Sequence, residues 1–92
     1  MDEQKLDELA EIFKAISHPM RLRIAIGLSK KEDCNVSVMV EKLGISQPNV
    51  SQHLNILKNA GVITKVRKGN FICYKLDNDF VKEIIKSIEE QM

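Results

Sequence analysis

The stretch SVMVEKLGISQPNVSQHLNILKNAG, residues 37–61, carries two helix patterns separated by a short turn. Ser37 can cap the first helix, and Gly44 ends it. Ser46 can cap the second helix, whose first turn tolerates Pro48. A helix, a three-residue turn and a second helix follow the order of a helix-turn-helix, which we therefore predict for residues 37–60.

The second of these helices should bury one face and expose an uncharged one. Val50, Leu54 and Leu57 recur at helical spacing and should point toward a core. Between residues 46 and 57 there is no Asp, Glu, Lys or Arg, whereas an ordinary solvent-exposed helix usually carries Lys and Glu. Amide and hydroxyl groups donate and accept hydrogen bonds, as base edges in the DNA major groove require. We predict base contacts for Gln47, Pro48, Ser51 and Gln52.

The segment after this helix predicts a basic β-hairpin. Residues 62–66 and 71–76 have the composition of strands, and the turn is RKGN at 67–70, because Gly and Asn tolerate positive φ. Between residues 58 and 75 the chain has several Lys and Arg residues and no Asp or Glu, whereas both ends of the chain are acidic. The segment 58–75 therefore suits a polyanion such as DNA. A solvated hairpin with ordinary lysines is the alternative. The residues expected at the DNA backbone or in the wing are Ser46, His53, Lys65, Arg67, Lys68 and Asn70.

Apolar stripes predict a helix at each end of the chain. The first spans residues 2–17, and His18 ends it because the residue before a proline avoids the helical conformation; we expect His18 to be structural or near a phosphate. Pro19 opens a second helix that should lie in the core. The last helix should begin near Asp77. Because a chain of 92 residues builds only a marginal core, we predict a dimer interface from Leu6, Leu9, Phe13, Val81, Ile84, Ile85 and Ile88.

Other features of the chain limit the class of protein. No apolar run approaches the ~20 residues of a membrane span, and the acidic start MDEQKLDEL lacks the regions of a signal peptide, so we expect a cytoplasmic protein without a membrane partner. The sequence has no evident catalytic constellation and no glycine-rich phosphate loop, so we expect no enzymatic activity. We predict one domain over residues 1–92, with dimerisation helices at 1–17 and 77–92 and a wing at 62–76.

Two segments, FKAISHPMRLRIAIGL at 13–28 and VSVMVEKLGISQPNVSQHLNILKNAGVITKVRKGNFICYKL at 36–76, resemble the ArsR/SmtB family of winged-helix repressors. The most specific part is SQPNVSQHL, because Ser and Gln recur at these positions of the family's recognition helix. The resemblance implies a mainly α fold with a small β wing, built from about five helices and a hairpin.

The same resemblance implies a function. It implies a homodimer that binds a roughly palindromic double-stranded DNA operator and blocks transcription, often until an inducer binds. Gln47, Pro48, Ser51 and Gln52 fall where the family reads bases. The alternative is a winged helix that binds another protein and does not read DNA sequence.

The familiar metal sites of that family lack their ligands in this chain. Its CxC pair on the third helix corresponds to Asn35 and Ser37, and its other common site corresponds to Asn78, Phe80 and Gln91. A transition-metal site needs several thiolate or imidazole ligands, which these positions do not supply. We therefore expect no metal and no cofactor, and we expect zinc to change operator affinity little.

Cys34 and Cys73 are candidates for a redox response. They lie far apart in the sequence without a CxxC motif, so reduced thiols are the default, and a free cysteine is often simply a small buried hydrophobe. A winged helix commonly pairs its short first strand, here residues 34–36, with the returning wing strand, which would bring the thiols together. If their Cα atoms lie within ~7 Å, oxidation could bridge them and lower DNA affinity. Otherwise a constitutive repressor is the better interpretation.

Overall fold

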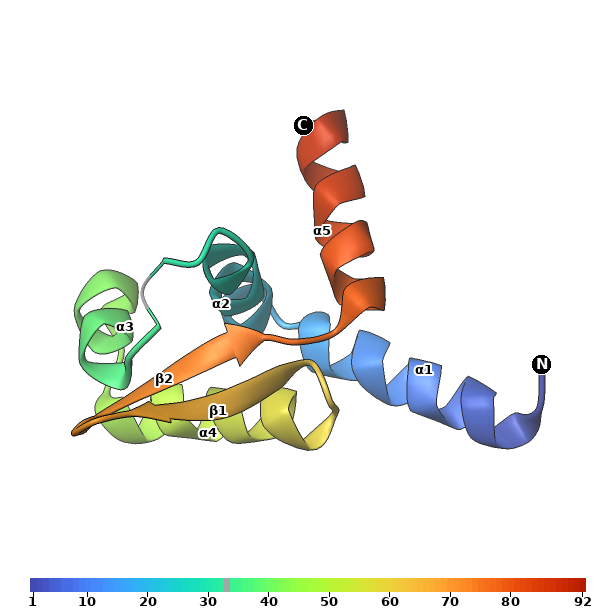
Figure 1. Ribbon diagram of the computed structural model, residues 1–92. Helices are drawn as coiled ribbons and strands as arrows, with labels where there is room; N and C mark the ends of the chain where they lie inside the picture. Colours follow the sequence, from blue (N-terminus) through green and yellow to red (C-terminus); the bar gives the residue numbers. More distant parts are fainter. Residues whose placement is uncertain (33) are drawn as a thin grey trace.

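Helices and one β-hairpin make up the chain (Figure 1). The computed structural model describes residues 1–32 and 34–92, and within these ranges it has five helices and one two-stranded antiparallel sheet. None of the helices in these ranges has the length and apolar character needed to cross a membrane. The arrangement is a winged helix-turn-helix, which confirms the predicted fold class. Its elements are α1 (Glu3–Ile16), α2 (Pro19–Ser29), α3 (Val36–Leu43), α4 (Gln47–Asn59), β1 (Ile63–Lys68), β2 (Phe71–Leu76) and α5 (Asp79–Gln91).

The core forms where α2 and α4 meet the base of the hairpin. On α4 the predicted inward face, Val50, Leu54 and Leu57, is fully buried. α2 contacts α4 and buries Ile24 and Ala25, so its predicted place in the core is confirmed. Burial of these side chains fixes the orientation of α4, and the opposite face of this helix is left to solvent.

The turn between α3 and α4 has the predicted chemistry. Gly44 ends α3 in the left-handed conformation, with φ 68, and its N–H donates to the Val40 carbonyl at 3.0 Å. The Oγ of Ser46 accepts a hydrogen bond from the N–H of Asn49 at 3.3 Å and so caps α4. Pro48 lies in the first turn, where it interrupts no helical hydrogen bond. The helix-turn-helix is therefore present where the sequence predicts it.

The start of α3 differs from the prediction. Asn35, and not Ser37, is the N-cap, because Asn35 Oδ1 accepts a hydrogen bond from the Val38 N–H at 2.9 Å. Asn35 has the extended backbone that a cap requires, with φ −108 and ψ 156, whereas Ser37 already lies inside the helix. The expected strand at 34–36 is also wrong, since α3 begins within it.

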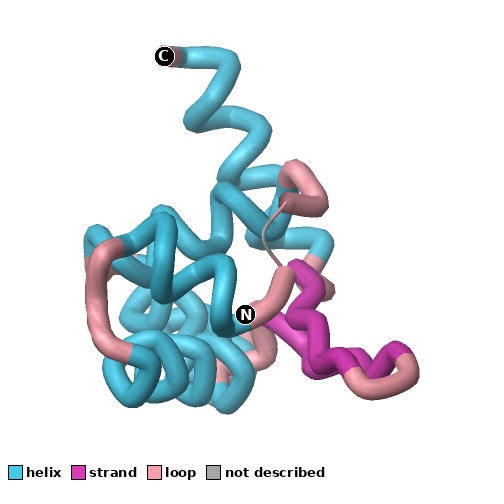
Figure 2. The backbone as a smooth tube through the Cα atoms, turned by 90° about the vertical axis from the view of Figure 1, so that its left-hand side faces the viewer, coloured by secondary structure: helices cyan, strands magenta, loops and turns pink. Residues whose placement is uncertain are grey.

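The hairpin is longer and its turn is tighter than predicted. Arg67 and Lys68, expected in the turn, belong to β1, and Lys68 pairs with Phe71. The turn is the dipeptide Gly69-Asn70, in which Gly69 has φ 60. A two-residue turn of this kind matches the twist of the strands, so pairing continues to its edge. In Figure 2 the hairpin projects from the helices, which is the arrangement of a wing.

The two end helices extend away from the other elements (Figure 1). On α1 the side chains of Leu6 and Phe13 are 59% and 49% exposed. The chain exposes 6405 Å², whereas a compact monomer of 10.5 kDa exposes about 5,400 Å². The excess fits two helices whose apolar sides are only partly covered within the protomer.

The predicted dimer face needs one correction. Val81 and Ile85 are 0% and 2% exposed because α5 packs them into the core of its own protomer, where it contacts α2. These two side chains offer no surface to a partner, so their assignment to an interface is wrong. The apolar side chains of the end helices that stay exposed or half-buried define the α1–α5 apolar surface: Leu6, Leu9, Phe13, Phe80, Ile84 and Ile88.

Gly27 and Gly44 should respond in opposite ways to alanine. Gly27 lies within α2, and a Cβ added there would meet no atom within 4 Å. Because alanine loses less backbone entropy on folding, Gly27→Ala should raise the free energy of unfolding by about 0.4–1 kcal/mol. Gly44 has the same open space but a φ of 68, where alanine is strained, so Gly44→Ala should lower it. Urea unfolding followed by circular dichroism measures both variants, and a loss of stability in Gly27→Ala would contradict the expectation.

Candidate nucleic-acid interface

The exposed side of α4 carries the four residues predicted to contact bases. Gln47, Pro48 and Gln52 are exposed, and Ser51 is half-buried beside them. The Gln47 side-chain amide donates to Ser51 Oγ at 3.2 Å. Exposed Asn55 continues this row one turn further along the helix. The structure brings the four residues together on one helix face, and their contact with bases stays a prediction.

The wing presents basic side chains on both of its faces. Alternate residues of a strand point to opposite sides, so Lys65 and Arg67 share one side of β1 and Lys68 lies on the other. All three side chains are exposed, as is Asn70 in the turn. β1 contacts α4, which places the base of the wing next to the helix that carries the predicted base-contacting residues. The sequence predicts these residues as one group, whereas the structure divides them between two faces.

His53 lies on the flank of α4, beside the junction of α1 and α2. Its Nδ1 is 3.4 Å from Nη1 of Arg21, and its ring centroid is 4.7 Å from that of His18. The structure thus places His53 beside the start of α2, and its expected role at the wing or at a phosphate stays a prediction. His18 Nδ1 accepts a hydrogen bond from the Met20 N–H at 3.1 Å and caps α2, which confirms its structural role.

Arg21, which the sequence prediction did not include, lies beside the predicted site residue His53. Its Nε donates to the Ala15 carbonyl at 2.6 Å, which holds the guanidinium beside His53. The only sequence signal is its place in the first turn of a helix opened by Pro19, and this signal says nothing of its neighbours in space.

Acid should destabilise the fold through His53. Burial, and then the positive charges of His18 and Arg21, lower the pKa of His53 from its usual 6.5. When the pH falls below 6.5, His53 becomes protonated in the unfolded chain but stays neutral in the folded protein, because its folded pKa is lower. The free energy of unfolding is therefore highest above pH 6.5 and decreases as the pH falls toward the folded pKa. Between pH about 7 and about 5, the urea midpoint of His53→Gln should fall less than that of the wild type. Equal falls would contradict this role.

The helix-turn-helix and the start of the wing match a family model. Residues 18–65 match the model described as bacterial regulatory protein, arsR family. The chain belongs to the arsR family. This arsR-family chain is 40% identical over 87 residues to the uncharacterized HTH-type transcriptional regulator MJ1325 of Methanocaldococcus jannaschii, over 95% of the chain and 98% of that protein. It is 45% identical over 74 residues to the transcriptional repressor SdpR of Bacillus subtilis, over 80% of the chain and 81% of SdpR.

A solved structure extends this similarity to the end helices of the arsR-family chain. The crystal structure of the transcriptional repressor PagR of Bacillus anthracis superimposes with a TM-score of 0.85 at 36% identity, covering 95% of this chain and 99% of PagR. The family expected from the sequence is therefore confirmed. As a member of it, the chain is a transcriptional regulator and not an enzyme.

In this arsR-family protein, positions that hold ligands in the family's familiar metal sites have structural tasks. Asn35 and Asn78 are the N-caps of α3 and α5, and the side-chain amide of Asn78 also donates to the Gly61 carbonyl at 3.1 Å. Phe80 packs edge-on against Phe13, with ring centroids 5.8 Å apart. Within residues 1–32 and 34–92, no three His, Cys, Asp or Glu side chains gather as a set of metal ligands would.

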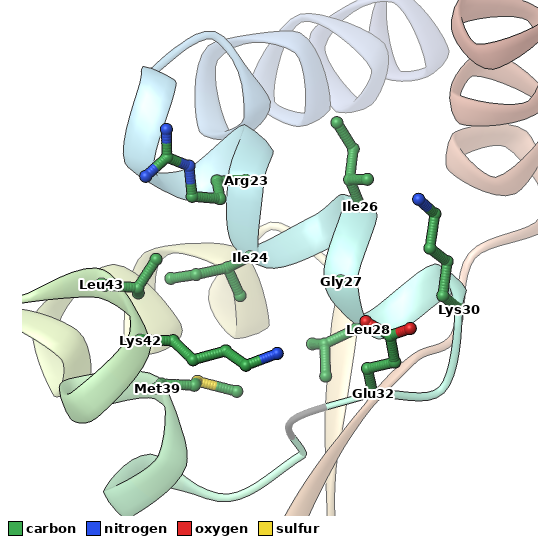
Figure 3. A pocket seen from close by; sticks show the side chains of 10 residues that line it. All are labelled: Arg23, Ile24, Ile26, Gly27, Leu28, Lys30, Glu32, Met39, Lys42 and Leu43. Carbon is green, nitrogen blue, oxygen red and sulfur yellow. The ribbon is translucent and has the colours of Figure 1, made fainter.

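A cavity of about 300 Å³ lies beside the helix-turn-helix, between α2 and α3 (Figure 3). Ile24 and Leu28 from α2 and Met39 from α3 form part of its apolar lining. Charged side chains lie around them, and these are Arg23, Lys30, Glu32 and Lys42. Because none of the lining residues belongs to α4 or to the hairpin, this cavity takes no part in the predicted DNA contacts.

Proposed function

We propose that this arsR-family regulator represses transcription as a homodimer that reads a roughly palindromic DNA operator. The observation that carries the proposal is the uncharged polar face of α4, on which Gln47, Ser51 and Gln52 can each donate and accept hydrogen bonds. Base edges in the major groove present donors and acceptors in patterns that such groups can distinguish. The relatives SdpR and PagR are transcriptional repressors, which supports repression. Since this activity needs access to the chromosome, we place the protein in the cytoplasm.

The basic and polar groups around α4 would hold the DNA backbone. Contacts to phosphates orient a protein on the duplex without reading its sequence. The wing cations can approach one strand, and His53, held by Arg21, can donate to a phosphate on the other flank of α4. The residues proposed for the backbone are Ser46, His53, Lys65, Arg67, Lys68 and Asn70.

Two protomers joined through the α1–α5 apolar surface would present two α4 helices to one duplex. Half-sites of a palindromic operator repeat after about one DNA turn, ~34 Å. The protomer measures 41 × 29 × 23 Å, which is of the same order as this repeat. The dimer is therefore part of the DNA-binding site in this proposal.

A winged helix that binds another protein is the rival function, because an uncharged helix face also suits a protein surface. Titrations with two duplexes separate the two functions: a duplex that the protein selects from a random-sequence library, and an unselected one. Repression predicts that the selected duplex binds about 10³–10⁷ times more tightly, and that log K falls linearly with log salt concentration. Equal affinities for both duplexes, or an affinity independent of salt, would decide for the rival.

Neutralising the wing should weaken binding to all DNA uniformly. The variant Arg67→Gln/Lys68→Gln removes two exposed cations and leaves the core unchanged. Phosphate contacts carry no sequence information, so the affinities for selected and random duplexes should fall together, and the salt slope should flatten by ~0.9 per lost contact. Fluorescence anisotropy over a series of salt concentrations measures both effects.

A matched variant tests whether the position of the charge matters. Lys82→Gln/Lys86→Gln makes the same change of charge on α5, on exposed residues away from the wing. Its DNA affinity and salt slope should stay close to those of the wild type. An unaltered slope in the wing variant, or an equal loss in the α5 variant, would count against the wing as a phosphate-binding element.

A further inference from the structure

Cys34 and Cys73 meet where the wing joins the helix-turn-helix. Cys34 directly precedes the N-cap of α3, and Cys73 lies in the middle of β2, opposite Val66. The structure joins the two cysteines by a disulfide, with Cα atoms 4.7 Å apart, a separation that suits such a bond. The Tyr74 N–H donates to the Cys34 carbonyl at 2.8 Å, so the backbone also holds the two segments together. This Cα separation is below the ~7 Å within which oxidation can bridge two cysteines.

A cavity whose described lining carries positive charge lies at the two cysteines. Its volume is about 380 Å³, and both cysteines line it together with the apolar Leu28. Three lysines complete the charged part of the lining, and no acidic side chain of the described residues contributes to it. Clefts lined by one sign of charge concentrate ions of the opposite sign. The cavity therefore favours small anions, and the lysines concerned are Lys31, Lys68 and Lys75.

We propose that Cys34 and Cys73 form a redox-active pair that exchanges with small anionic disulfides and thiols, and that its oxidation weakens operator binding. The regulatory half rests on the proposed repressor function, whereas the exchange itself does not. In a reducing cytoplasm a disulfide is usually transient and redox-sensing or catalytic. A half-buried pair at the wall of a cationic cavity is open to such exchange, while a pair sealed in the core would not be.

The exchange needs no reactant beyond the small disulfide, RSSR. One cysteine thiolate attacks a sulfur of RSSR, the S–S bond of RSSR breaks, and a mixed disulfide forms while RS⁻ leaves. The second cysteine thiolate attacks the protein sulfur of the mixed disulfide, so the bond between Cys34 and Cys73 forms and the second RS⁻ leaves. The two leaving thiolates take up the two protons that the cysteines lost. Two electrons thus pass from the protein to RSSR, and an excess of RSH reverses both steps.

The bridge connects this exchange to the DNA-binding surface. Without the disulfide, only non-covalent contacts such as the Tyr74 hydrogen bond would hold the middle of β2 to the segment before α3. We infer that the hairpin of the reduced protein is then freer to tilt about its base. In the oxidised protein a covalent bond fixes β2 to the segment before α3. The wing and the helix-turn-helix then move as one body and cannot adjust separately to the DNA backbone and the major groove. Operator binding should therefore weaken on oxidation.

Operator titrations of the reduced and oxidised protein test the regulatory half. Glutathione disulfide is the oxidant, dithiothreitol reverses it, and intact mass under non-reducing conditions reports the loss of two hydrogens within one chain. The oxidised protein should bind the selected duplex about 5- to 150-fold more weakly and recover on reduction. Cys34→Ser/Cys73→Ser, which has neither thiol, should bind like the reduced wild type and ignore the oxidant, whereas each single variant can go no further than the mixed disulfide. Equal or tighter binding by the bridged protein would overturn the proposal.

Failure of the redox proposal can be distinguished from failure of the proposed repressor function. If the protein does not read DNA, the reduced form will show no preference for the selected duplex over the random one. If only the redox proposal fails, that preference will persist and oxidation will leave it unchanged.

The rate of bridging tests the cavity and needs no DNA. Glutathione disulfide carries net negative charge, and cystamine carries positive charge. To correct for the intrinsic reactivity of each probe, its rate with the protein is divided by its rate with a short cysteine peptide. The anionic probe should be favoured at least about tenfold at low salt, and less as salt is raised. Lys31→Gln/Lys75→Gln should lose the preference, while Lys82→Gln/Lys86→Gln should keep it. A preference no greater than that of the peptide, or a bridge between chains, would overturn the site.

Discussion

Replacing Leu6 and Phe13 by aspartate is expected to convert the protein from a dimer into a monomer that has lost most of its operator affinity. Both side chains are about half exposed in the protomer, 59% and 49%, and both belong to the α1–α5 apolar surface. In a dimer the two new carboxylates would leave water without a partner, which is strongly unfavourable. In the monomer they stay solvated, so the substitutions favour dissociation over unfolding.

Loss of the dimer should cost more than loss of any single DNA contact. When one protomer of a dimer is bound, the second binds its half-site as an intramolecular event, which raises overall affinity by about 10²–10⁴. Affinity for the selected duplex should fall by a factor of this order. Light scattering should show the mass change from twice the chain mass of 10.5 kDa to that mass itself.

A control on the opposite side of α1 separates the interface from the helix. Gln4→Asp introduces an aspartate at an exposed position away from the apolar stripe. It should leave the dimer intact in light scattering and the affinity for the selected duplex unchanged. If circular dichroism shows that the double variant does not fold, Leu6→Asp alone changes the more exposed of the two side chains. A wild-type protein that binds the operator as a monomer would rule out the proposed arrangement.

The helix-turn-helix and the wing could be predicted because several local signals agree there. Gly44 and Ser46 mark the turn, the spacing of Val50 and Leu54 fixes the inward face of α4, and Gly69 marks the hairpin. Each of these signals acts within a few residues, so no knowledge of the tertiary structure is needed. For the same reason the exposed face of α4 followed from the sequence, since the inward face determines it.

Other features depend on contacts between distant segments and could not be predicted. The stripe on α5 predicts an apolar face, but burial of Val81 and Ile85 in the protomer depends on how α5 packs against α2. The approach of His53 to Arg21 likewise depends on the angle between α4 and α2. The choice of Asn35 over Ser37 as a cap is local, and it was missed because both residue types cap helices well.

Discrimination between operator and random DNA should fall sharply when the amides of α4 are removed. Gln47→Ala and Gln52→Ala each delete a group that donates and accepts hydrogen bonds, and the base edge left without a partner makes the loss specific to the operator. Each variant should lose about 1–3 kcal/mol of discrimination. Folding should survive, because both side chains are exposed and alanine favours the helix.

The same substitution at the far end of α4 provides the control for this prediction. Recognition helices contact base edges with their N-terminal residues, and Asn59 lies at the C-terminal end of α4, about 18 Å from Gln47 along the helix axis. Asn59→Ala should therefore leave discrimination close to that of the wild type. The measured quantity is the ratio of affinities for the selected and random duplexes at one salt concentration, because phosphate contacts cancel in this ratio. If the ratio is unchanged in both glutamine variants, α4 does not read sequence, and its uncharged face must be explained by contact with another protein.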